Sequence, residues 1–196
     1  MASVALRLAA PKRPVLQGAI PVLVIALMMG FSLPNVASVL ASPITARTSN
    51  QAVPGDGIAL ATWLRDHSDP ADLVATNLHC RPLPATPSVC DARHFWLSAH
   101  AERRVLVEGW AYTPNALASS RESGVGYSVA PFWDPPLLAL NDLAFSDPSP
   151  AILAELRDRY GVRWLFADLT EADADALGLQ ADLRHRVGDF GVFELR

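Results

Sequence analysis

The chain has 196 residues, with 16 basic and 20 acidic side chains and a formal net charge of −4. This balance supplies no basic field to hold a phosphate backbone, which excludes nucleic acid as an expected partner. Charged residues make up only 18% of the chain, and its sixteen prolines favour ordered loops over long helices. The length is near the upper end for one ordinary domain.

The N-terminal part holds an apolar segment at residues 15–33, in which Gln17 and Ser32 are the polar side chains. As a helix it would span about 28 Å, close to the roughly 30 Å hydrocarbon core of a bilayer. Basic residues precede the segment, and none follows it before Arg47. The positive-inside rule therefore predicts a single-pass transmembrane helix with residues 1–14 in the cytoplasm and the C-terminal domain outside. A cleaved signal peptide is the alternative, and it predicts the same compartment.

A linker is expected at residues 34–56, because its second half is polar, contains prolines and lacks periodicity. The extracytoplasmic domain is then expected at 57–196. It begins with an amphipathic helix at 57–67, which Asp56 can cap, and continues with a short buried strand at 73–76.

The middle of the domain gives weaker signals. Residues 77–93 contain three prolines and both cysteines, and they predict a loop. A short helix is expected within 94–102 and a strand at 104–108. Residues 111–131 are rich in Gly, Ser and Asn and predict an irregular stretch, which in a compact domain is usually functional or disordered.

The C-terminal third alternates helix and strand signals and ends in a hairpin signal. A proline follows the expected start of the first two helices, at Asp134 and Ser149, Gly161 follows the second helix, and Gly188-Asp189 favours a two-residue turn. The pattern predicts a mixed α/β sheet that carries helices and ends in a β-hairpin. The expected helices are 134–144, 150–160 and 171–177, and the expected strands are 162–167, 183–187 and 190–195.

Cys80 and Cys90 are the only cysteines in the chain. Outside the cytoplasm such a pair predicts a disulfide. Free thiols and a metal site that adds His79, His94 and His100 are the alternatives, although this spacing matches no standard zinc pattern. No metal and no cofactor is predicted.

A candidate ligand site follows from aromatic side chains that stand close in sequence to carboxylates and arginines. Such groups recognise sugars by ring stacking and bidentate hydrogen bonds. The same residue types also cover cores and form solvated ion pairs, so that interpretation stays open. Asp91 and Glu108 also suggest a carboxylate pair for glycosidic chemistry, although their spacing in sequence does not fix the distance between them. The candidates are Asp91, Arg93, Glu108, Trp110, Tyr112 and Trp133.

Five segments together carry a resemblance to a known group of proteins. They are SLPNV (32–36), WLRDH (63–67), ATN (75–77), CDARHFWLSAHAERRVLVEGWAY (90–112) and YGVRWLFAD (160–168). In this order they resemble the C-terminal end, a last membrane helix plus an outer domain, of actinobacterial polytopic membrane proteins similar to GT-C glycosyltransferases and YfhO-like proteins.

For GT-C enzymes, the resemblance implies lipid-linked sugars as substrates and catalytic carboxylates in the first outer loop, between the first two membrane helices. This sequence has one predicted span and no such loop, so no catalytic residue is carried over. We therefore expect a membrane-anchored, non-catalytic extracytoplasmic domain that binds a cell-envelope glycan or a polytopic membrane partner. The alternative is a fragment or subunit of a GT-C-type glycosyltransferase, so enzyme activity stays undecided.

Overall fold

The computed structural model describes residues 53–83 and 86–196. The predictions for residues 1–14 and 15–33, and nearly all of the linker predicted at 34–56, lie outside these described residues. The described residues from Val53 to Arg196 form one compact unit.

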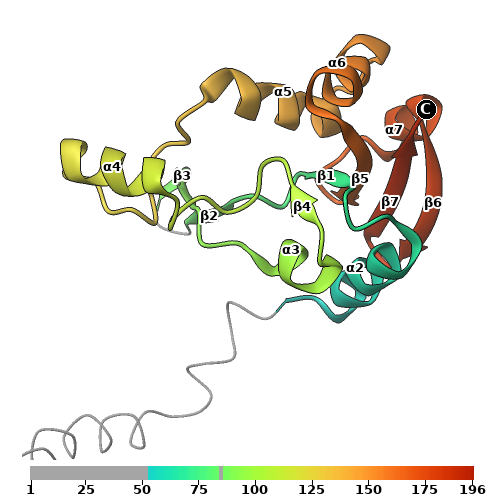
Figure 1. Cartoon of the computed structure of the whole chain (residues 1–196), viewed down its shortest axis with the longest axis horizontal. Coiled ribbons are helices and arrows are strands. Elements are labelled where there is room, and N and C mark those ends of the chain that lie inside the picture. The colour runs from blue at the N-terminus through green and yellow to red at the C-terminus, as the bar shows by residue number, and fades with distance from the viewer. Residues whose placement is uncertain (1–52, 84–85) are drawn as a thin grey trace, which may run out of the picture. The chain divides into compact units, whose positions relative to one another are not determined.

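Six helices and seven strands occur in this part of the chain (Figure 1). The helices are α2 (Gly55–His67), α3 (Trp96–Ala101), α4 (Pro114–Ser123), α5 (Pro135–Ser146), α6 (Pro150–Tyr160) and α7 (Ala174–Gln180). The strands are β1 (Leu73–Thr76), β2 (Arg81–Leu83), β3 (Thr86–Asp91), β4 (Arg104–Val105), β5 (Val162–Asp168), β6 (Ala181–Val187) and β7 (Phe190–Leu195).

Five strands form one mixed sheet in the order β4-β1-β5-β7-β6. Strands β4, β1 and β5 are parallel, and β7 runs antiparallel between β5 and β6. Strands β6 and β7 form the predicted C-terminal hairpin, which turns at Gly188 with a φ of 56°. The predicted mixed α/β domain with a terminal hairpin is therefore confirmed.

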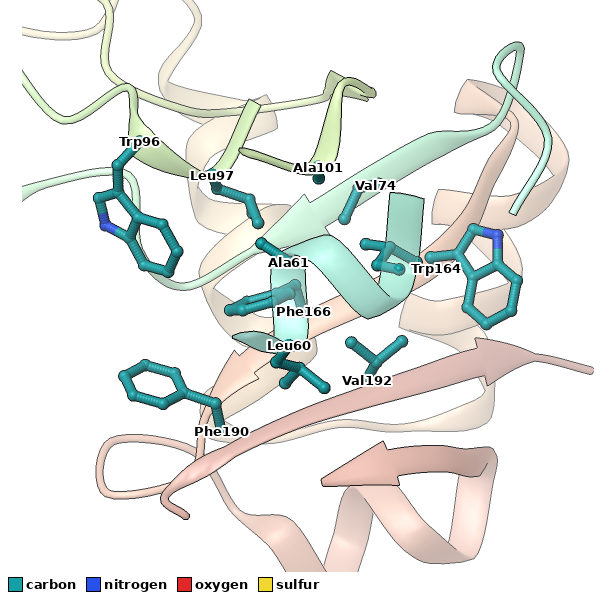
Figure 2. Close-up of a cluster of buried hydrophobic side chains, with 11 residues drawn as sticks. Leu60, Ala61, Val74, Trp96, Leu97, Ala101, Trp164, Phe166, Phe190 and Val192 are labelled. Carbon is teal, nitrogen blue, oxygen red and sulfur yellow. The ribbon is translucent and has the colours of Figure 1, made fainter. Parts of the chain in front are cut away.

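Alternating side chains of the sheet build two apolar cores. Val74 and Phe166 pack with α2 and α3, together with Leu60 and Trp96 (Figure 2). Ala75 and the other set of β5 side chains pack with α5, α6 and α7. This two-residue alternation on a sheet covered on both faces explains why β5 is an almost continuous apolar run.

A third apolar cluster lies outside these two layers. It is built from the segments that follow β3 and β4, from α4 and from the residues before α5. In Figure 1, α4 and the β2–β3 hairpin lie to one side of the main sheet, away from β6 and β7. We call this part the side lobe. Its buried members are Ala92, Val107, Trp110, Ala111, Ala116 and Phe132.

A buried arginine joins the ends of α2 and α3. Arg103 is only 7% exposed. Its Nη2 donates to the carbonyls of Arg65 and Ser68 at 2.5 and 2.7 Å, and its Nε donates to Ser68 Oγ at 2.8 Å. Its Nη1 donates to the Glu102 carbonyl at 3.0 Å. The cation thus satisfies carbonyls that helix C-termini leave without partners.

The predicted fold began with a transmembrane helix, and that prediction is corrected. In residues 53–83 and 86–196, no helix is long and apolar enough to cross a membrane. The longest, α2, has 13 residues and carries Asp56, Arg65 and Asp66. At 1.5 Å per residue it reaches about 20 Å, which is short of the roughly 30 Å that a bilayer core requires. The segment 15–33, where the span was predicted, lies outside the described residues.

Several elements differ from the sequence prediction. Helix α2 begins at Gly55, so Asp56 lies in its first turn instead of capping it, and α7 covers 174–180 instead of 171–177. The loop predicted at 77–93 contains the β2–β3 hairpin, and the strand predicted at 104–108 is only the two residues of β4. Helix α4 lies in the stretch predicted to be irregular, with Thr113 as its cap and Pro114 at its first position. The helix was missed because it is mostly polar and buries only Ala116.

We predict that Arg103→Met lowers the free energy of unfolding by about 2–3 kcal/mol, because partly buried carbonyls lose their donors. Chemical denaturation measures this change. Arg104→Ala is the matched control, since Arg104 is exposed and donates to one carbonyl, that of Ala71. Equal losses for the two variants would contradict a clamping role for Arg103.

Candidate functional site

The side lobe contains the predicted disulfide. Cys80 and Cys90 are bonded, with their Cα atoms 5.5 Å apart. The bond ties the residue before β2 to the end of β3, beside the pair formed by Arg81 and Asp91 across the hairpin. It thereby engages both sulfurs that the metal alternative required. In residues 53–83 and 86–196, no group of three His, Cys, Asp or Glu side chains is arranged to hold a metal ion.

Three backbone segments of the side lobe meet at Ala92. The Ala92 amide donates to the Ser128 carbonyl at 2.8 Å, and the Ala92 carbonyl accepts from the Ala111 amide at 3.2 Å. The Gly109 amide donates to the His94 carbonyl at 2.9 Å. The stretches that follow β3, β4 and α4 therefore lie side by side.

Gly109 permits the closest of these approaches. A Cβ atom at this position would lie 2.6 Å from the Ala92 carbonyl oxygen and 2.6 Å from the His94 amide nitrogen. Both neighbours are backbone atoms, which cannot swing away as a side chain can. Glycine is therefore required for the segment that leads to Tyr112 to lie against the segment that carries Arg93.

A fork of hydrogen bonds fixes Arg93 at this junction. Its Nε and Nη2 donate to the two Asp91 carboxylate oxygens at 2.9 and 2.8 Å, and its backbone amide donates to Oδ1 at 3.1 Å. Arg81 Nη2 lies 3.7 Å from the same carboxylate. The Arg93 hydrogen bonds hold the pKa of the Asp91 carboxyl below its ordinary value, although burial acts in the opposite direction. The Arg93 side chain is 44% exposed, so its guanidinium is both fixed and accessible.

Two exposed tyrosines lie on the segments that hydrogen-bond to Ala92, one next in sequence to Ala111 and the other next to Ser128. Tyr112 is 58% exposed and Tyr127 is 39% exposed, and their ring centroids lie 5.4 Å apart. Hydrogen bonds and charge from Asp91 raise the pKa of Arg93, and the Tyr112 and Tyr127 phenols add smaller effects in the same direction. We call Asp91, Arg93, Tyr112 and Tyr127 the Arg93 surface.

The structure brings together three of the six predicted ligand residues, namely Asp91, Arg93 and Tyr112. Tyr127 was missed, because sequence gives no sign that its segment returns to Ala92. An aromatic residue within a Gly- and Ser-rich stretch was the one signal that could have identified it.

The other three predicted residues have different surroundings. Trp110 is 3% exposed and its Nε1 donates to the Ala130 carbonyl at 2.7 Å, so it is a core residue. Trp133 is 46% exposed and packs on Phe132 instead, with centroids 4.3 Å apart.

Glu108 stabilises α3 rather than facing a ligand. Its Oε1 accepts from the Ser98 amide at 2.9 Å, in the first turn of a helix that has no side-chain cap of its own. Burial raises the pKa of this carboxyl. Because Asp91 binds Arg93, both carboxylates of the suggested glycosidic pair make structural contacts.

A second polar group lies at the carboxyl ends of β1 and β5, where open α/β sheets commonly bind ligands. The Asn77 side chain donates to the Asp168 carbonyl at 3.0 Å and accepts from the Asp168 amide at 2.9 Å. The Asn77 side chain thereby connects the end of β1 to the end of β5. Beside it, His79 Nε2 lies 2.7 Å from Asp142 Oδ1, and Asn141 donates to the Thr76 carbonyl at 2.9 Å.

A third site is a pocket of about 320 Å³ lined by Trp63, His67, Trp164, Leu183 and Arg184. His67 and His185 stack on Trp63, with centroids 4.2 and 4.7 Å away. Trp164 is 3% exposed. The aromatic faces of this pocket are thus already covered by protein.

We predict that Asp91→Asn lowers the free energy of unfolding by about 1–3 kcal/mol at pH 7, because a charged hydrogen-bonded fork is lost. The folded-state pKa of Asp91 is lowered, so its contribution is present above the unfolded pKa of about 3.9 and disappears as pH falls through the folded value. Denaturation measured from pH 7 down to pH 2 should show the two proteins converging. The exposed Asp66→Asn is the control, and a pH-independent difference for Asp91→Asn would contradict the assignment.

We predict that Gly109→Ala lowers the free energy of unfolding by about 1–3 kcal/mol, because the new methyl group would force backbone apart. Thermal or chemical unfolding measures the loss. Gly178→Ala in α7 is the control, since a Cβ there meets nothing within 4 Å and alanine favours a helix. If the two variants are equally stable, Gly109 is not needed for the close approach.

Compared with known proteins, the chain matches no family, and no curated protein matches its sequence. Its resemblance to actinobacterial membrane proteins therefore stays a prediction.

Proposed function

We propose that the described domain is an extracytoplasmic, non-catalytic recognition domain that binds a glycan at the Arg93 surface. The observation that carries the proposal is the exposed Tyr112 ring on the segment that hydrogen-bonds to Ala92, next in sequence to Arg93, whose guanidinium Asp91 holds in place. The proposal concerns residues 53–196.

The compartment is supported by the bond between Cys80 and Cys90. Disulfides persist in oxidising compartments and are rare where cellular thiols are kept reduced. A covalent link between the residue before β2 and the end of β3 also suits a lobe whose apolar cluster is small. It restricts the chain directly before Asp91 and Arg93.

Sugar recognition is supported by the chemistry and accessibility of the surface. An exposed aromatic ring can pack on the C–H face of a pyranose, while a fixed guanidinium and phenol groups bind its oxygens. Because Asp91 already orders Arg93, binding does not have to immobilise that long side chain, and this reduces the entropic cost of binding.

The other sites suit a sugar less well. In the Trp63 pocket, both tryptophans are engaged by neighbours, and His67 and His185 cover Trp63. At the strand ends, the Asn77 amide makes its hydrogen bonds to Asp168. The Arg93 surface combines exposed rings with an ordered cation, which favours it as the glycan site.

The test is binding of the full chain to bacterial cell-envelope glycans, measured by calorimetry or on an array. We expect Tyr112→Ala to weaken binding about two- to tenfold, since aromatic stacking contributes about 0.5–1.5 kcal/mol. Leu179→Ala is the control, because Leu179 is 73% exposed on α7 and remote in sequence from the surface. Absence of binding, or equal binding by Tyr112→Ala and the native chain, would contradict the proposal.

A further inference from the structure

The hydrogen-bonding groups of the Arg93 surface are unevenly divided between donors and acceptors. An arginine side chain has five N–H donors and no acceptor. The only carboxylate of the surface belongs to Asp91, whose side chain is 5% exposed. A ligand therefore meets the guanidinium and the phenols, while the carboxylate is covered.

Most of the acceptor capacity of Asp91 is already in use. Oδ1 accepts from the Arg93 backbone amide and from Nε, and Oδ2 accepts from Nη2. Arg81 approaches Oδ2 at 3.7 Å. Within this surface, a neutral sugar hydroxyl that donates finds only the phenol oxygens of Tyr112 and Tyr127 to accept its proton.

The donors of Arg93 are used only in part. The fork occupies Nε and Nη2, and within residues 53–83 and 86–196 Nη1 has no hydrogen-bond partner. The side chain is 44% exposed, so Nη1 belongs to a guanidinium that solvent and ligands can reach. It offers two N–H groups and a positive charge on the surface that also carries the exposed Tyr112 and Tyr127.

We infer that the glycan bound at this surface is acidic, with a carboxylate or phosphate oxygen at Arg93 Nη1 and a sugar ring on Tyr112. The inference rests on the proposed function and specifies its ligand class. Anionic oxygens are acceptors without protons to place, and charge-assisted hydrogen bonds to arginine are roughly twice as strong as neutral ones. The buried Asp91 carboxylate orders the cation without presenting its own charge to the ligand.

The experiment compares three oligosaccharides of equal length with the native full chain: a neutral one, one that carries uronate groups and one that carries phosphate groups. We expect at least one acidic probe to bind about tenfold more tightly than the neutral probe, and added salt to reduce this preference. The two acidic probes distinguish a carboxylate from a phosphate as the anion. This comparison does not depend on whether any variant folds.

Arg93→Gln should abolish the preference for the acidic probe. Arg157→Gln is the matched control, because Arg157 forms the same two-nitrogen fork with Asp158 on α6 and is 45% exposed. The preference should survive in that variant. Arg93→Lys should recover only part of the preference, since an ammonium keeps the charge but loses the fork.

Three outcomes would overturn the inference. Equal, Tyr112-dependent binding of neutral and acidic probes would contradict an acidic ligand and leave the proposed glycan site standing. An acidic preference that Arg93→Gln leaves unchanged would remove Arg93 from the recognition of the anion. Binding of none of the three probes would contradict both proposals.

Discussion

Backbone packing around Ala92 is the constraint on which the side lobe depends. Ala92 is fully buried, and its amide and carbonyl both hydrogen-bond to other segments, at Ser128 and Ala111. These bonds join stretches that the sheet does not pair. Because Gly109 has no side chain, the stretch that follows β4 can lie in contact with the stretch that follows β3. The same arrangement turns Arg93 and Tyr112 outward together, which makes one surface from residues nineteen positions apart in sequence.

The main sheet and the side lobe have different roles in the domain. The sheet has two well-filled cores, and Arg103 fixes the ends of α2 and α3 against each other. At the carboxyl edge, where a ligand site is expected in an open sheet, Asn77 bridges β1 to β5 through the Asp168 backbone. The sheet therefore acts as a scaffold, and the groups available to a ligand lie on the segments inserted between β1 and α5.

Sequence periodicity predicted the parts of the fold that depend on local signals. Helix α6 ends at Gly161, which has a φ of 77°, as its position after an apolar stripe indicates. The β6–β7 hairpin follows from Gly188. Helix α4 and the β2–β3 hairpin were missed, because one buries a single alanine and the other is proline-rich. The prediction that the fold includes a transmembrane helix was wrong. The longest helix in the described residues has 13 residues, and none of the helices there could span a membrane.

Only part of the candidate site could be predicted, because local sequence signals do not show long-range contacts. The sequence shows that aromatic, acidic and basic residues gather between positions 90 and 133. Asp91 and Arg93 lie on the same side of their extended segment, as the two-residue alternation of side chains predicts, and they are hydrogen-bonded. Composition does not show which aromatic ring is buried. Trp110 turns inward to a backbone carbonyl, whereas Tyr112 points outward. Long-range backbone bonds decide this difference, and they bring in Tyr127 as well.

If one continuous surface of three segments binds the ligand, backbone amide NMR during titration with an acidic oligosaccharide will locate it. We expect the shifted amides to cluster at residues 91–94, 111–113 and 126–128, while those lining the Trp63 pocket stay unchanged. Shifts confined to the Trp63 pocket or to the ends of β1 and β5 would contradict it.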